Sequence, residues 1–175
     1  MSDERGFTVI ELAVVSLLVL ILLSLGAASI RHYWRVRSVQ SAQDDLVAQM
    51  KQAQARSMAE SHPLLYGLRL RPGTGPGAAS TWGFVRYDYN AQTCQELSSH
   101  LFEAGAYVSA ASFTVLNPGP TEKCRAQISG AASDQFVFLF ARGSATAGTV
   151  TVKADGVTKT RQVTVDGITG RIARS

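Results

Sequence analysis

Cysteine and histidine are scarce in this sequence of 175 residues. It contains two cysteines and three histidines, with no C-x-x-C pair and no Cys/His cluster at metal-ligand spacing. None of His32, His62 and His100 is spaced with a carboxylate or a cysteine in a catalytic pattern. Three acids scattered through strands and loops are interpreted as solvated surface: Asp88, Glu96 and Glu103. We therefore expect no catalytic residues, no metal and no cofactor, and hence no enzyme.

Charge is also scarce, and its distribution is uneven. Charged residues make up 17% of the chain and hydrophobic residues 46%, and residues 12–30 contain no charge at all. As a helix rising about 1.5 Å per residue, this stretch would measure roughly 28 Å, close to the hydrocarbon thickness of a membrane. The rest has the composition of an ordinary soluble domain. The sequence therefore predicts a membrane-spanning segment attached to one domain.

The signals for the compartment of that domain conflict. Arg31, Arg35 and Arg37 follow the apolar stretch, which favours a cytoplasmic location for the C-terminal side. Cys94 and Cys124 are compatible with a single disulfide, which would need an oxidising compartment. Two buried free thiols are the alternative. Composition alone leaves the topology open.

An ordinary secretory signal peptide is a second interpretation of the N-terminus. Residues 26–29, G-A-A-S, supply a small-x-small cleavage site. Against this interpretation, Asp3 and Glu4 stand beside the single arginine of the leader, and Glu11 interrupts the start of the apolar region. The order glycine, phenylalanine, threonine and then glutamate needs another explanation.

Residues 6–12, G-F-T-V-I-E-L, resemble the Gly-Phe-Thr-Leu-Ile-Glu-Leu signature of type IV prepilins and type II secretion pseudopilins. The resemblance implies a leader of residues 1–6, cleavage after Gly6 by a prepilin peptidase on the cytoplasmic side, and methylation of the new N-terminal Phe7. It also implies that Glu11 is an assembly residue, which pairs with the N-terminal amine of a neighbouring subunit. A glutamate that only reaches back to the membrane interface is the alternative.

A second helical pattern follows the apolar stretch without a break. Apolar residues recur at spacings of three and four on one face, which predicts an amphipathic helix: Val39, Ala42, Leu46, Met50 and Ala53. Pro63 ends this helix near Ser61. We expect one continuous helix from Phe7 to about Ser61, with residues 7–30 as the transmembrane or filament-core half and residues 31–62 as the periplasmic half.

Residues 63–175 are predicted to form a β-rich globular domain. Residues 64–70 and 82–89 read as a strand pair around a glycine- and proline-rich loop. Residues 135–140 are apolar on both faces and predict a central strand, and the following segment alternates and turns at residues 155–156 and 166–167. Residues 90–130, which hold both cysteines, remain irregular and unassigned. The predicted fold class is α+β and pilin-like, with a long N-terminal helix packed against a C-terminal antiparallel β-sheet.

Residues 138–152, F-L-F-A-R-G-S-A-T-A-G-T-V-T-V, and the terminal T-G-R-I resemble the C-terminal domain of the GspH/FimT family of minor pseudopilins and minor pilins. The resemblance implies a structural minor pseudopilin of a type II secretion system, at the tip region of the periplasmic pseudopilus. Its partners would be the major and other minor pseudopilins. It would sit in the inner membrane as a single-pass protein with its C-terminal domain in the periplasm. The alternative is a FimT-like minor pilin of a type IV pilus.

A basic C-terminus raises DNA as an alternative partner. The candidate phosphate contacts are Lys159, Arg161, Arg171 and Arg174, and no aromatic residue follows Phe140 to stack bases. DNA-binding FimT-like pilins carry a Gly-Arg-x-Arg motif, whereas this chain has one more residue between its arginines. On an extended strand, Arg171 and Arg174 would then face opposite ways. A solvated basic rim is therefore favoured over DNA capture.

Overall fold

The computed structural model describes residues 8–60, 62–73, 80–102, 105–116, 119–129 and 133–175, without the side chains of residues 25–29. The chain divides into two compact units, Met1–Trp34 and Arg35–Ser175. All of the described buried residues lie in the second unit. That unit therefore carries its own core.

Helix α1 (Val9–Ala59) corresponds to the long helix predicted from Phe7 to about Ser61, and both of those end residues lie outside the described part of the chain. In the second unit, its stripe of small and apolar residues is buried against the strands: Val39, Ala42, Leu46, Met50 and Ala53 are at most 6% exposed. Helical spacing places these residues on one face, and their burial in the core stabilises this part of the helix. The α+β fold class, with a long helix packed on antiparallel strands, is confirmed.

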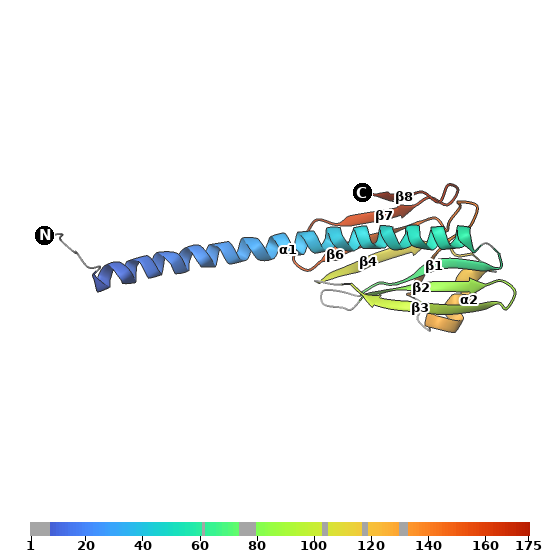
Figure 1. Ribbon diagram of the computed structural model, residues 1–175, viewed down its shortest axis with the longest axis horizontal. Helices are drawn as coiled ribbons and strands as arrows, with labels where there is room; N and C mark the ends of the chain where they lie inside the picture. Colours follow the sequence, from blue (N-terminus) through green and yellow to red (C-terminus); the bar gives the residue numbers. More distant parts are fainter. Residues whose placement is uncertain (1–7, 61, 74–79, 103–104, 117–118, 130–132) are drawn as a thin grey trace. The chain divides into compact units, whose positions relative to one another are not determined.

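The strands form two antiparallel sheets, where the sequence predicted one (Figure 1). The first has the order β3-β2-β1-β5, from β3 (Thr93–Leu101), β2 (Thr81–Asp88), β1 (Leu64–Arg71) and β5 (Gln135–Leu139). The second has the order β4-β6-β7-β8, from β4 (Ala106–Phe113), β6 (Gly148–Ala154), β7 (Arg161–Val165) and β8 (Ile172–Arg174). The predicted pairing of the first two strands is confirmed, with Gly67 opposite Val85.

The prediction of a central strand at residues 135–140 was wrong in position. Strand β5 pairs only with β1 among the described strands and lies at the end of its sheet. Both of its faces are buried, and its outer edge is covered: the backbone N–H of Thr146 donates to the Phe138 carbonyl, and Leu139 bridges Ala145. Burial on two faces therefore reflected coverage by other elements, and not a central place in the sheet.

The segment that the sequence left unassigned, residues 90–130, is largely regular. It forms β3, β4, helix α2 (Pro120–Cys124) and a π-helical turn η1 (Arg125–Ser129). Strand β3 reads T-C-Q-E-L-S-S-H-L and is mostly exposed, so it lacks the apolar pattern by which strands are recognised. Pairing with β2 along its whole length makes it a strand.

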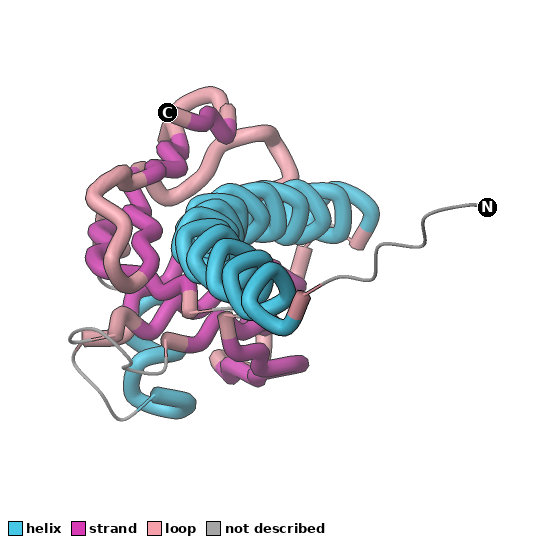
Figure 2. Tube along the Cα trace, turned by 90° about the vertical axis from the view of Figure 1, so that its left-hand side faces the viewer, coloured by secondary structure: helices cyan, strands magenta, loops and turns pink. Residues whose placement is uncertain are grey.

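The first sheet has a separate core on each face. Tyr66, Leu68 and Val137 pack in the cluster that contains α1. Leu65, Val85 and Phe136 pack in a second cluster with both cysteines. Figure 2 shows α2 beyond the strands, on the side away from α1. The sheet is thus covered by α1 on one face and by the α2–η1 segment on the other.

Candidate functional site

The first half of α1 exposes apolar side chains around its circumference. The exposed residues include consecutive positions such as Leu17, Leu18, Val19 and Leu20. Among the residues that the structure describes, no helical stretch combines the length and mean hydropathy needed to cross a membrane. The span predicted over residues 12–30 includes residues 25–29, whose side chains lie outside the described residues.

The start of α1 is held by a reciprocal cap between Thr8 and Glu11. The Glu11 Oε2 atom accepts the backbone N–H of Thr8 at 3.1 Å and its hydroxyl at 3.2 Å, and the Glu11 N–H donates to Thr8 Oγ1 at 3.3 Å. This is the capping-box arrangement of T-x-x-E, a signal readable in T-V-I-E that the sequence reasoning missed. Gly6 and Phe7 lie outside the described residues. Glu11 therefore has a local structural role besides the one predicted for it.

The structure joins Cys94 and Cys124 in a disulfide. Cys94 belongs to β3 and Cys124 ends α2, and both side chains are buried. The bridge fastens the α2–η1 segment to the first sheet and forms part of the second core. Of the two alternatives for these cysteines, the structure contains the paired one.

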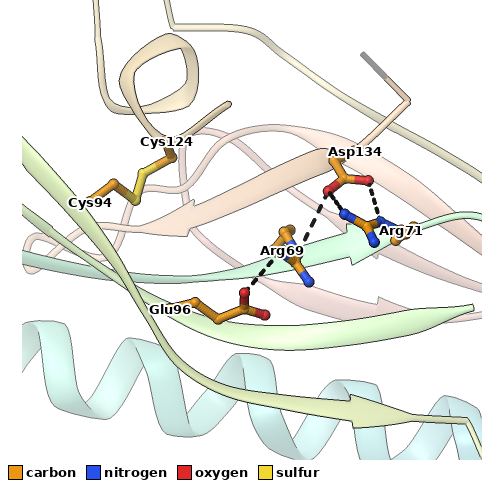
Figure 3. Close-up of polar contacts among 6 residues, drawn as sticks. All are labelled: Arg69, Arg71, Cys94, Glu96, Cys124 and Asp134. Carbon is orange, nitrogen blue, oxygen red and sulfur yellow. Dashed lines mark hydrogen bonds and ion pairs between the residues drawn. A yellow bond between two sulfur atoms is a disulfide. The ribbon is translucent and has the colours of Figure 1, made fainter. Parts of the chain in front are cut away.

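An ionic cluster, largely buried except for Arg71, crosses the first sheet beside the disulfide (Figure 3). Arg69 Nη1 lies 2.8 Å from Glu96 Oε2, and Arg69 Nε lies 3.7 Å from Asp134 Oδ2. Arg71 donates to Asp134 through two nitrogens, at 3.0 and 3.1 Å, and these hydrogen bonds raise the pKa of Arg71 above its usual value. Two positive and two negative groups neutralise one another, so the cluster ties β1 to β3 and to the start of β5.

Two of the three acids interpreted as solvated surface, Asp88 and Glu96, lie in the described part of the chain and have specific partners. The interpretation of Glu96 was wrong, because its carboxylate is mostly buried against Arg69. Asp88 accepts the backbone N–H groups of Asn90 and Ala91 and so shapes the turn after β2. Glu103 lies outside the described residues. Neither described acid pairs with another acid, and sequence reasoning missed the partners Arg69 and Asp134 because buried charges give no periodic signal.

The C-terminal strands are attached to the second half of α1 by polar contacts. Arg174 Nη1 lies 2.6 Å from Asp44 Oδ1, an ion pair whose side chains are about half exposed. The buried Gln43 amide donates to the carbonyls of Gln162, at 2.7 Å, and Ser175, at 3.3 Å. The Arg174 guanidinium, predicted as a candidate phosphate contact, is therefore already engaged by a carboxylate.

The other basic candidates are dispersed. Arg171 lies before β8, in the turn that follows β7, whereas Arg161 begins β7 and Lys159 precedes it.

The turn between β7 and β8 is organised by Asp166. The pKa of Asp166 is lowered mainly because the Thr169 backbone N–H and hydroxyl donate to its carboxylate; the charge of Arg171 contributes less. The 155–156 and 166–167 turns open connections of six residues, longer than the tight hairpins predicted.

Neither a protein-family model nor a curated protein matches the sequence. Among solved structures, the chain is similar to the minor pseudopilin EpsH from the Type 2 Secretion System of Vibrio cholerae. The TM-score is 0.50 at 11% sequence identity, and the match covers 79% of this chain and 96% of that chain. At this identity the likeness concerns the fold alone. The chain thus has the fold of a minor pseudopilin, as its N-terminal motif and its C-terminal half predicted.

Proposed function

We propose that the chain is a structural minor pseudopilin of a type II secretion system, which assembles in the tip region of a periplasmic pseudopilus and assists protein secretion. The observation that carries the proposal is a minor-pseudopilin fold whose helix exposes apolar side chains in its first half and buries a stripe in its second. Apolar side chains exposed around a helix need lipid or other helices around them. The partners are the major pseudopilin and the other minor pseudopilins.

The proposed route begins in the inner membrane. A prepilin peptidase removes residues 1–6, Phe7 is methylated, and residues 7–30 hold the chain in the membrane before they enter the filament core. The domain then lies in the periplasm, an oxidising compartment that suits the Cys94–Cys124 disulfide. Mass spectrometry of the mature protein should find a methylated Phe7 at its N-terminus. A mature chain that begins at Ser29 would instead indicate an ordinary signal peptide and refute the proposal.

Glu11 is the proposed assembly residue, and its contacts make the role testable. Its carboxylate both caps the helix through Thr8 and carries a charge within an apolar segment. Glutamine also serves in a capping box, whereas alanine does not. Glu11→Gln therefore removes the charge and keeps the cap, and Glu11→Ala removes both.

If Glu11 neutralises the amine of a neighbouring subunit, both variants should be cleaved and inserted normally but incorporated poorly into filaments. Incorporation is measured by pull-down with the other pseudopilins from cells that make the whole set. A Glu11→Gln chain that assembles as well as the wild type would show that the charge is dispensable and that capping is the role of this residue.

The alternative, a FimT-like minor pilin that captures DNA, is not favoured because Arg174 is held by Asp44. A fragment of residues 35–175 should not shift duplex DNA at physiological ionic strength. Asp44→Ala, which releases Arg174, serves as the control for residual basic contacts. A salt-sensitive shift by the wild-type fragment, lost in the Arg171→Ala/Arg174→Ala double variant, would reverse this preference, since phosphate contacts weaken steeply with salt.

A further inference from the structure

We propose that the free edge of β3 binds an extended segment of a partner pseudopilin, which adds a strand to the first sheet. The inference rests on the proposed function for the identity of the partner. It goes beyond that function because it names the surface and the mode of contact, main-chain hydrogen bonding along a sheet edge.

One side of β3 has no neighbouring strand within the described part of the chain. Strand β3 pairs with β2 alone, with Cys94 opposite Tyr87 and Ser99 opposite Gly83. The Cys94 N–H donates to Gln127 and so points away from β2. Along an antiparallel strand, the N–H and carbonyl of successive residues point alternately toward and away from the partner strand. The bulge at Leu97 shifts this alternation by one residue, so the N–H and carbonyl of Ser99 also point away from β2.

One position of this edge already shows which chemistry it accepts. The Gln127 side-chain amide accepts the Cys94 N–H at 2.6 Å and donates to the Gln92 carbonyl at 3.1 Å. A single amide thus imitates the peptide group of a neighbouring strand at the start of β3. Gln127 belongs to η1, which the disulfide holds against the sheet. The remainder of the edge, from Glu96 to Leu101, offers the same groups to another chain.

The other sheet edges are short or covered. The edge of β4 is covered by Gly73, whose N–H donates to the Val108 carbonyl, and by Ser80, whose hydroxyl accepts the Val108 N–H. The edge of β5 is covered by Ala145 and Thr146, and β8 has only 3 residues. Strand β3, with 9 residues, is the long edge left open in the described part of the chain; Figure 1 shows it as the outermost strand of its sheet.

Strand β3 lacks two of the usual protections against strand addition, because it contains no lysine and no proline. Its protective features are the bulge at Leu97 and the inward-turned carboxylate of Glu96, and neither of them occupies the outward N–H groups of Ser99 and Leu101. Leu97 is 43% exposed and Leu101 63% exposed, so an incoming strand would bury apolar surface as well as pair backbone groups.

A groove beside this edge has room for the partner's side chains. Trp82 and His100, stacked with ring centroids 4.5 Å apart, line it together with Gln49, Gln52 and Arg56 of α1, and its volume is about 520 Å³. Alternate side chains of an added strand point to one face of the sheet and would enter this groove. Its amide and aromatic lining fits polar and aromatic side chains.

The test replaces one outward N–H without touching the pairing to β2. Ser99→Pro removes that N–H, and proline is tolerated on an edge strand at such a position. Ser99→Ala is the matched control because it keeps the N–H. Each is made in the fragment 35–175, which contains the whole described core. Binding is measured by calorimetry against the purified periplasmic domains of the other pseudopilins from the same cell.

At least one domain should bind the wild type. Ser99→Pro should weaken that binding by about tenfold, the expected loss for one or two main-chain hydrogen bonds, while Ser99→Ala leaves it unchanged. Hydrogen exchange on the wild-type complex should slow at the Ser99 and Leu101 amides, a readout that holds even if the proline variant folds poorly. Binding without slower exchange at this edge would overturn the inference and leave the proposed function standing. Absence of binding to every pseudopilin domain would count against both the strand-addition inference and the proposed function.

Discussion

The two halves of α1 differ in what their polar side chains bind as well as in their apolar pattern. In the first half, the Ser16 and Ser24 hydroxyls donate to the carbonyls of Leu12 and Ile21, within the same helix. In the second half, Gln43 and Asp44 reach the C-terminal strands instead. These two hydroxyls thus bond within their own helix and leave its surface apolar, whereas Gln43 and Asp44 of the second half hold the C-terminal strands.

The difference shows that helix formation and helix burial are separate properties of the sequence. Both halves are helical, but Leu20 is 64% exposed while Leu46 is fully buried. The first half is apolar on every side and leaves its surface for other partners, while the second is apolar on one stripe that the strands cover. The predictions below test this contrast, in descending order of expected effect.

The largest difference in stability is expected between substitutions of Leu46 and of Leu20. Leu46→Ala should destabilise the domain by about 2 to 5 kcal/mol, since it leaves a cavity in a closed core. Leu20→Ala, the matched control, should leave the free energy of unfolding within about 0.5 kcal/mol of the wild type. Chemical denaturation of the full chain in mild detergent, followed by tryptophan fluorescence, measures both. Equal losses in the two variants would abolish the distinction between the halves.

A smaller effect is expected from the polar contacts. Gln43→Ala leaves the Gln162 and Ser175 carbonyls without their amide donor and should cost about 1 to 3 kcal/mol. Ser16→Ala removes a hydroxyl that only bonds back to its own helix, so it should be close to neutral. Both are compared by thermal unfolding of the full chain. A Gln43 variant as stable as the Ser16 variant would show that the C-terminal strands do not depend on this contact.

The ion pair between Asp44 and Arg174 should contribute less. Its side chains are about half exposed, and exposed pairs contribute roughly 0.2 to 1 kcal/mol. A double-mutant cycle with Asp44→Asn and Arg174→Gln measures the coupling free energy of the pair. This coupling free energy should shrink in high salt. A coupling that persists in high salt would indicate a less solvated pair than the structure shows.

The smallest expected effect is the pH dependence of the turn after β7. The folded pKa of Asp166 lies below its usual value of 3.8, so the carboxylate stabilises the fold above that value and loses this contribution as pH falls through the folded pKa. Carbon NMR titration of Asp166 should report the lowered pKa. Thr169→Val, which removes the hydroxyl donor and keeps the backbone one, should raise it part of the way. A pKa at or above the usual value would contradict the bonding described.

Prediction from the sequence succeeded where a pattern is local and periodic. The buried stripe of α1 and the pairing of β1 with β2 were readable because apolar spacing and turn residues mark them directly. The capping box of Thr8 and Glu11 was equally readable in T-x-x-E but was overlooked in favour of the family motif. These features need only neighbouring residues.

Prediction failed where a residue's environment comes from distant segments. Strand β3 has little apolar pattern in its sequence, and its pairing with β2 is what makes it a strand. The buried charges of Arg69 and Asp134 meet across 65 positions of the chain (134 minus 69), and no local pattern marks such a pair. The edge position of β5 depends on Thr146 and Ala145 covering its outer side.

By itself, the sequence determined the long helix, its division into an apolar half and a half with one buried stripe, and the α+β class, because helical spacing and alternation are properties of consecutive residues. The tertiary structure decided that the strands form two sheets, that Cys94 of β3 pairs with Cys124 of the α2–η1 segment, and that Arg174 is bound by Asp44. These outcomes depend on which segments, distant in the sequence, bury their apolar surfaces against one another. A pattern of consecutive residues does not identify those segments.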